Sequence, residues 1–165
     1  MLPDVLGPGL VVVFCGTAPS PVSAKAGAYY AGPGNRFWPI LHLCGLTPYK
    51  LQPREYILLP TWGLGLTDLV KTRYGMDRDL VESDHDVAGL WQRISGCSPA
   101  MLAFTSKQAA RKALGVRHVD LGCRGRLAAG GPEIHVLPST SGRAAGYWDE
   151  GPWHALARRV RDLRD

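Results

Sequence analysis

The chain has 165 residues, of which 45% are hydrophobic and 20% charged, so we expect one globular domain spanning residues 1–165. No apolar run reaches the roughly 18 residues of a membrane helix, and the N-terminus, with Asp4 and no basic segment, is unlike a signal peptide. We therefore expect neither a membrane anchor nor secretion, and the net charge of +5 suits a polyanionic partner.

The first half of the chain begins with a strand pattern. The continuous apolar run at residues 10–14 predicts a strand buried on both faces of a parallel sheet. The Gly-, Pro- and Ser-rich residues 16–34 predict a long functional loop. Helical spacing at residues 37–43 predicts a helix that stops at Gly45, and residues 64–70 form a short apolar segment around a Thr-Asp pair.

The second half of the chain alternates helix and strand patterns. It predicts a helix at 81–94, a strand at 100–104, a helix at 107–114 capped by Ser106, a hairpin of 126–129 with 133–137, and a helix at 153–163. This alternation predicts an α/β fold, a three-layer α/β/α sandwich around a mostly parallel central sheet.

Cysteine and histidine spacing gives no pattern typical of metal ligands. The four cysteines form no Cys-x-x-Cys pair, and none of the five histidines is paired at ligand spacing. We therefore expect reduced, mostly buried thiols, no metal site and no cofactor. His135 alternates with apolar residues and is expected to be structural.

Three segments carry the chemical signal. Residues 14–20 (Phe-Cys-Gly-Thr-Ala-Pro-Ser) and 136–143 (Val-Leu-Pro-Ser-Thr-Ser-Gly-Arg) each break from an apolar run into a loop of small residues. Such loops let the backbone approach a ligand closely. With residues 29–38 (Tyr-Tyr-Ala-Gly-Pro-Gly-Asn-Arg-Phe-Trp), they resemble the base pocket and DNA wedge of uracil-DNA glycosylases, above all the mismatch-specific uracil/thymine glycosylase family.

The resemblance implies the fold of that superfamily and a set of site residues. Tyr30 would stack on a flipped base, and Arg143 takes the wedge position where the family uses leucine. The implied substrate-binding residues are Gly16, Thr17, Ala18, Ser20, Ser23, Tyr30 and Asn35. The implied DNA-binding residues are Lys25, Ser106, Lys107, Ser141, Gly142 and Arg143.

The chain departs from the family at the catalytic positions. Ala18 replaces the family's water-positioning asparagine, and a methyl group cannot hold a water. Asp68 is the candidate replacement, because a carboxylate can stabilise an oxocarbenium-like sugar and deprotonate water. The alternative is a surface acid beside Lys71. Ser139 lies where other branches have histidine, so it is a second catalytic candidate, with phosphate or water binding as its alternative.

These features predict a monofunctional uracil-DNA glycosylase of base excision repair, a monomer acting on DNA in the cytoplasm, at the nucleoid. It would flip uracil out of DNA and hydrolyse its N-glycosidic bond without a cofactor. A lyase step needs an amine, for which Lys25 and Lys107 are the nearby candidates.

Three alternatives remain open. The protein can be a uracil- or abasic-DNA-binding module with little catalysis, because Ala18 replaces the asparagine. It can also be a glycosylase for another deaminated base, hypoxanthine or xanthine. A nucleotide-binding domain is disfavoured, because neither a P-loop motif nor a Gly-x-Gly-x-x-Gly motif follows the first strand.

Overall fold

A computed structural model describes residues 2–164 of the chain, and these residues form one five-stranded sheet. The strand order is β2-β1-β3-β5-β4. β2 (Leu64–Asp68), β1 (Val12–Gly16), β3 (Met101–Phe104) and β5 (Glu133–Val136) are parallel neighbours, and β4 (Gly122–Arg126) pairs antiparallel with β5. The expected mostly parallel sheet is therefore confirmed.

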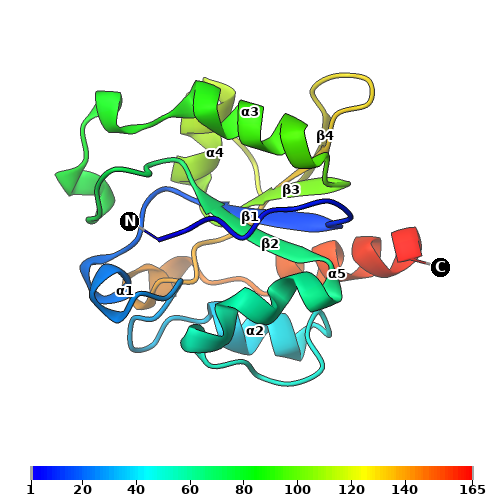
Figure 1. Cartoon of the computed structure of the whole chain (residues 1–165), viewed down its shortest axis with the longest axis horizontal. Coiled ribbons are helices and arrows are strands. Elements are labelled where there is room, and N and C mark those ends of the chain that lie inside the picture. Colours follow the sequence, from blue (N-terminus) through cyan, green and yellow to red (C-terminus); the bar gives the residue numbers. More distant parts are fainter. Residues whose placement is uncertain (1, 165) are drawn as a thin grey trace.

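Helices cover both faces of the sheet, as Figure 1 shows, with α3 and α4 above it and α1, α2 and α5 below it in this view. The α-helices are α1 (Pro21–Ala26), α2 (Phe37–Leu43), α3 (Val87–Cys97), α4 (Lys107–Leu114) and α5 (Gly151–Arg164). The 3-10 helices are η1 (Pro53–Trp62), η2 (Asp77–Asp79), η3 (Glu82–Asp84) and η4 (Gly142–Tyr147). This is the expected three-layer sandwich. Within residues 2–164, no helix has the length and apolar character to cross a membrane.

The two halves of the core lie on opposite faces of β1, because successive side chains of a strand alternate in direction. Phe14 belongs to the lower cluster, where it stacks on Trp153 of α5 at 5.8 Å between ring centroids and meets the edge of Phe37 of α2 at 5.4 Å. Cys15 belongs to the upper cluster, with Leu90 of α3. Both faces of β1 are buried, which explains its continuous apolar run.

The expectation of one long loop over residues 16–34 is wrong in its middle part, which contains α1. The Ser20 hydroxyl accepts a hydrogen bond from the Ser23 N–H at 3.2 Å, and Pro21 occupies the first turn. Gly27 ends the helix in the left-handed conformation. Local capping therefore makes a short helix in a segment whose composition predicts a loop.

Two further boundaries differ from the expected ones. The helix expected at 81–94 begins at Val87, because Asp86 caps it by accepting from the Gly89 N–H at 3.0 Å, and Val81 is 55% exposed. The first hairpin strand is β4 rather than residues 126–129, and a register shift interrupts its pairing with β5 between Cys123 and Gly125.

Candidate active site

A large cavity lies at the carboxyl ends of the parallel strands, where ligands bind in open α/β folds. The cavity measures about 980 Å³. Loops that follow β1, β2, β3 and β5 line it, together with the segment between α1 and α2. Thirteen of the fifteen site residues expected from the sequence line it: Gly16, Thr17, Ala18, Ser20, Ser23, Tyr30, Asn35, Asp68, Ser106, Ser139, Ser141, Gly142 and Arg143.

The other two expected site residues, Lys25 and Lys107, do not line the cavity. Each is exposed, Lys25 on α1 and Lys107 at the beginning of α4. Neither side chain is therefore part of the cavity wall, and the expected contact of each with DNA stays a prediction. Ser106 lines it, but its hydroxyl caps α4 by accepting from the Ala109 N–H at 3.0 Å.

Asp68 is the one acidic side chain that is buried at the base of this cavity among the described residues. It is the last residue of β2, in register with Gly16 at the end of β1, and only 3% exposed. Its Oδ2 atom is buried without a hydrogen-bond partner within residues 2–164. The alternative of a surface acid is therefore wrong.

Burial raises the pKa of Asp68 from its usual 3.8 to about 7, against the opposing charges of Lys71 and Arg93. Asp4 adds to the rise. The group is therefore divided between its acid and carboxylate forms near neutral pH, which is the range suited to a general base.

Gly16 leaves the space in which three polar groups converge. A Cβ atom there would lie 2.9 Å from Asp68 Oδ1, 3.2 Å from Tyr30 Oη and 3.4 Å from Thr105 Oγ1. Tyr30 Oη and Thr105 Oγ1 are hydrogen bonded at 2.9 Å. The absence of a side chain at residue 16 thus brings a carboxyl and two hydroxyl groups to one point.

Tyr30 lies with one ring face against Phe37 of α2, at 4.0 Å between centroids and 17° between planes. Its backbone has a φ of +53°, a conformation that non-glycine residues rarely adopt. Burial raises the pKa of its hydroxyl, so the group stays protonated. Tyr30 is both packed against the core and part of the cavity wall.

Hydrogen bonds within the loops organise the cavity wall. The Ser23 hydroxyl accepts from the Ala31 N–H at 3.0 Å, which ties α1 to the segment that carries Tyr30. The Arg36 N–H donates to the Thr140 carbonyl at 2.8 Å, which joins that segment to the loop after β5. The two loops far apart in sequence are thus parts of one wall, as the resemblance implies.

The loop after β5 holds its shape through serine side chains. Ser139 Oγ accepts from the Ser141 N–H and Ser141 Oγ accepts from the Arg143 N–H, both at 3.2 Å. The Ser139 hydroxyl is therefore already used as an acceptor in the loop. Arg143 is exposed at the rim of the cavity. The loop ends at Trp148, whose ring lies 5.2 Å from the Arg36 guanidinium carbon.

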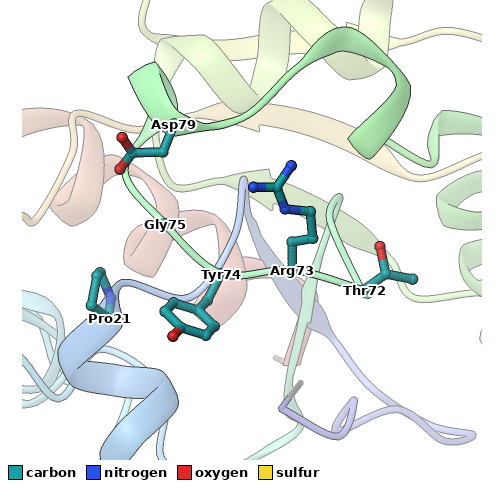
Figure 2. Close-up of a pocket in the computed structure, with 6 residues that line it drawn as sticks. All are labelled: Pro21, Thr72, Arg73, Tyr74, Gly75 and Asp79. Atoms are coloured by element: carbon teal, nitrogen blue, oxygen red, sulfur yellow. The ribbon is translucent and has the colours of Figure 1, made fainter.

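Segment 72–79 forms a wall that the sequence patterns do not indicate. It runs past the start of α1, where the Gly75 N–H donates to the Pro19 carbonyl at 3.0 Å. A smaller hollow of about 460 Å³ lies there, and Figure 2 shows Tyr74 and Pro21 among its lining residues. Because the segment has no hydrophobic periodicity and no motif, nothing in the sequence predicts its position.

Sequence reasoning also missed Thr105 and Tyr147. Thr105 directly follows β3, so the rule that places sites at the carboxyl ends of parallel strands could have found it. Tyr147 is 85% exposed at the end of η4 and lines the rim of the cavity. Its exposure is visible only in the structure.

A second cluster, at the opposite end of β5, brings together Cys123, Glu133 and His135, whose ligand atoms lie within 4.8 Å of one another. The Glu133 carboxylate is already bound by Arg159, at 3.1 Å from Nη2, and by His135 Nε2 at 2.8 Å. Arg159 and His135 hold its pKa down at about 2. The guanidinium charge opposes a cation there, so we assign the cluster a structural role.

Comparison with known proteins identifies the family. The model of the uracil DNA glycosylase superfamily matches residues 3–164. The chain belongs to the uracil DNA glycosylase superfamily. The matched residues include all the loops that line the cavity, so the candidate site lies within the part of the chain that matches the superfamily.

A solved structure has the same fold as this uracil DNA glycosylase superfamily member. It is the solution structure of a proposed uracil DNA glycosylase from Methanosarcina acetivorans, which is 24% identical. The match covers 97% of this chain and 96% of that one, with a TM-score of 0.67. At this identity the likeness concerns the fold alone.

Proposed function

We propose that this protein is a monofunctional uracil-DNA glycosylase, similar to the mismatch-specific uracil/thymine branch, that uses Asp68 in place of the branch's asparagine. It acts as a monomer on DNA in the cytoplasm. The observation that carries the proposal is the buried Asp68 carboxyl in the cavity that Ala18 also lines, with its Oδ2 atom unpaired within residues 2–164. Its pKa of about 7 fits a base that works near neutral pH.

The chemistry follows from the position of Asp68. Uracil, flipped into the cavity, stacks on Tyr30, a contact worth roughly 1–3 kcal/mol. The bond between C1′ and N1 breaks, and its electron pair leaves with the uracil anion. The Asp68 carboxylate stabilises the positive charge on the sugar and then accepts a proton as the water oxygen bonds to C1′. The proton then passes from Asp68 to the uracil anion, directly or through water, so that an abasic site and free uracil are the products and the carboxylate is restored.

A lyase step has no support in the cavity. No lysine is among its lining residues within the described chain, and Lys25 and Lys107 are on exposed helix positions outside it. A Schiff base at C1′ needs an amine, so we expect the DNA strand to stay intact. Strand scission therefore depends on later treatment with alkali.

The direct test uses a labelled oligonucleotide with one uracil, incubated with the purified protein and then treated with alkali. We expect a cut at the uracil that appears only after alkali. Matched oligonucleotides carrying hypoxanthine, xanthine or a thymine mismatch define the base range. Binding of uracil or abasic DNA without any cut would instead favour the binding module. Two features support that alternative: Ala18 cannot hold a water, and the Ser139 hydroxyl already accepts a hydrogen bond within its loop.

The rim residues Arg143 and Tyr147 should bind the DNA around the vacated stack. We expect Arg143→Ala and Tyr147→Ala each to weaken binding to an abasic-site duplex by about fivefold to a hundredfold, because stacking or phosphate contact contributes roughly 1–3 kcal/mol. Fluorescence anisotropy measures the affinity. Leu127→Ala is the control, since Leu127 is also exposed but belongs to the β4–β5 hairpin. If Arg143→Ala and Tyr147→Ala bound the abasic-site duplex as tightly as Leu127→Ala does, the proposed contact of the rim residues with DNA would be contradicted.

A further inference from the structure

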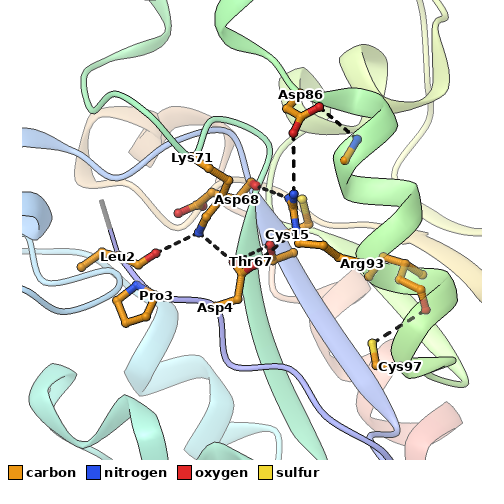
Figure 3. Close-up of polar contacts among 12 residues, drawn as sticks. Leu2, Pro3, Asp4, Cys15, Thr67, Asp68, Lys71, Asp86, Arg93 and Cys97 are labelled. Atoms are coloured by element: carbon orange, nitrogen blue, oxygen red, sulfur yellow. Dashed lines mark hydrogen bonds and ion pairs between the residues drawn. The ribbon is translucent and has the colours of Figure 1, made fainter.

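The N-terminal segment is fixed against the outer edge of β2, next to the candidate catalytic residue. Val5 and Leu66 exchange two backbone hydrogen bonds of 2.9 Å each, in an isolated antiparallel bridge. Leu2 and Val5 are buried in the core. This anchoring places Asp4 beside Thr67, one residue before Asp68, as Figure 3 shows.

Asp4 binds two cations with its two carboxylate oxygens. Its Oδ1 accepts from Thr67 Oγ1 at 2.8 Å and lies 2.7 Å from Lys71 Nζ. Its Oδ2 lies 3.3 Å from Arg93 Nε, an ion pair without hydrogen-bond geometry. All three charged side chains are about one-fifth exposed, so solvent screens these pairs only partly.

Both cations have their remaining contacts away from the Asp68 carboxylate. Lys71 donates to the Leu2 carbonyl at 2.9 Å, and Arg93 donates from Nη2 to the backbone carbonyl of Asp68 at 2.9 Å. Arg93 Nη1 also lies 3.9 Å from a carboxylate oxygen of Asp86, the residue that caps the beginning of α3. Among the described residues, the carboxyl of Asp68 is thus left without a cationic partner although two cations are close (Figure 3).

The groups that face Asp68 come from every element around it. Lys71 follows β2 and Arg93 is on α3, and both lower the pKa of Asp68, while Asp4 raises it. From β1 and the segment before α2 come the thiol of Cys15 and the phenol of Tyr30, whose own pKa values are raised and which are therefore neutral. Among these groups, Asp4 is the negatively charged side chain that pairs with both Lys71 and Arg93.

We propose that Asp4 is a positioning residue for Asp68: by engaging Lys71 and Arg93, it keeps both cations from pairing with the catalytic carboxylate and so sets the pH range in which the enzyme works. The inference rests on the proposed function, because it takes Asp68 as the base. Without Asp4, Lys71 is free to turn toward Asp68 and form an ion pair that keeps its carboxylate ionised at lower pH, which makes it a weaker base.

The test compares variants whose effects have opposite signs. Asp4→Asn keeps an acceptor for Thr67 but removes the charge, so the midpoint of the Asp68 titration should fall by about one pH unit. Lys71→Gln removes a cation, so the midpoint should rise. Asp120→Asn is the matched control, because Asp120 is 92% exposed, pairs with Arg124 and is not part of the cavity lining, so it should leave the midpoint in place.

Two readouts separate this inference from the proposed function. The titration of the Asp68 side-chain carbon by NMR needs no substrate, and the pH profile of single-turnover excision follows the same midpoint. Opposite displacements in Asp4→Asn and Lys71→Gln, with Asp4→Glu returning to the wild-type midpoint, support the role of Asp4. Unchanged midpoints, or displacements in one common direction, overturn it. A protein that shows the opposite displacements by NMR but excises no base leaves the role intact and refutes the proposed function.

Discussion

Asp68→Asn should lower the single-turnover rate of uracil excision by a factor of about 10²–10⁴, the range expected when a general base is lost. The amide keeps the size of the side chain, but it carries no negative charge for the sugar and cannot accept a proton from water. Quench-flow or gel-based single-turnover kinetics at saturating enzyme measure the effect. Asp120→Asn, at an exposed site far from the cavity lining, is the control and should match the wild type. An Asp68→Asn enzyme with the wild-type rate would remove Asp68 from the mechanism.

The same variant should stabilise the protein at high pH. The pKa of Asp68 is about 7 in the folded protein and 3.8 in the usual, solvated state, so the folded chain binds the proton more tightly. Between these values each pH unit removes about 1.4 kcal/mol of the free energy of unfolding, a loss on the order of 4 kcal/mol above pH 7. Asp68→Asn avoids this loss. Denaturant unfolding should therefore show a gain at pH 8 and none at pH 4, whereas a purely structural carboxylate would show a loss at pH 8.

Gly65→Ala should destabilise the fold by about 3 kcal/mol, because overpacking against fixed backbone is costly. A Cβ atom at Gly65 would lie 2.5 Å from the Val5 carbonyl oxygen and 2.7 Å from Leu10 Cδ1. The carbonyl cannot move away without breaking the bridge between Val5 and Leu66. Thermal or denaturant unfolding measures the loss, and the N-terminal segment should show faster amide exchange.

Gly7→Ala is the matched control for that substitution. Gly7 is in the same N-terminal segment, and a Cβ atom there would meet no atom within 4 Å. Its free energy of unfolding should stay within about 0.5 kcal/mol of the wild type. Equal effects at the two positions would show that the contact of Val5 with β2 is not tight.

The parts of the fold that could be predicted are those with local signals. The continuous apolar runs mark β1 and β3, because strands buried on both faces need no alternation. The cap at Ser106 marks the beginning of α4. By contrast, the start of α3 was misplaced because Val81 is at helical spacing yet exposed, and the true start depends on the Asp86 side chain and on a hydrogen bond from its N–H to the Leu69 carbonyl.

The residues of the candidate site also divide into those with a signal in the sequence and those without one. Residues on the loops after β1, β2 and β5 could be predicted because the carboxyl ends of parallel strands meet at one edge. Lys25 and Lys107 are on exposed helix positions outside the cavity lining although their neighbours in sequence line it, so their contact with DNA stays a prediction. The network of Asp4 with Lys71 and Arg93 joins three distant parts of the chain through tertiary contacts alone, so no sequence pattern predicts it.

The most direct test of the central claim is the rate of uracil release by the wild-type protein between about pH 5 and pH 9, under single-turnover conditions with saturating enzyme. The account predicts a rate that rises with pH through a midpoint near 7, the pKa of Asp68, and then levels off. Release of uracil at a rate independent of pH over this range, or no release at all, would contradict the claim that Asp68 is the catalytic carboxylate of a uracil-DNA glycosylase.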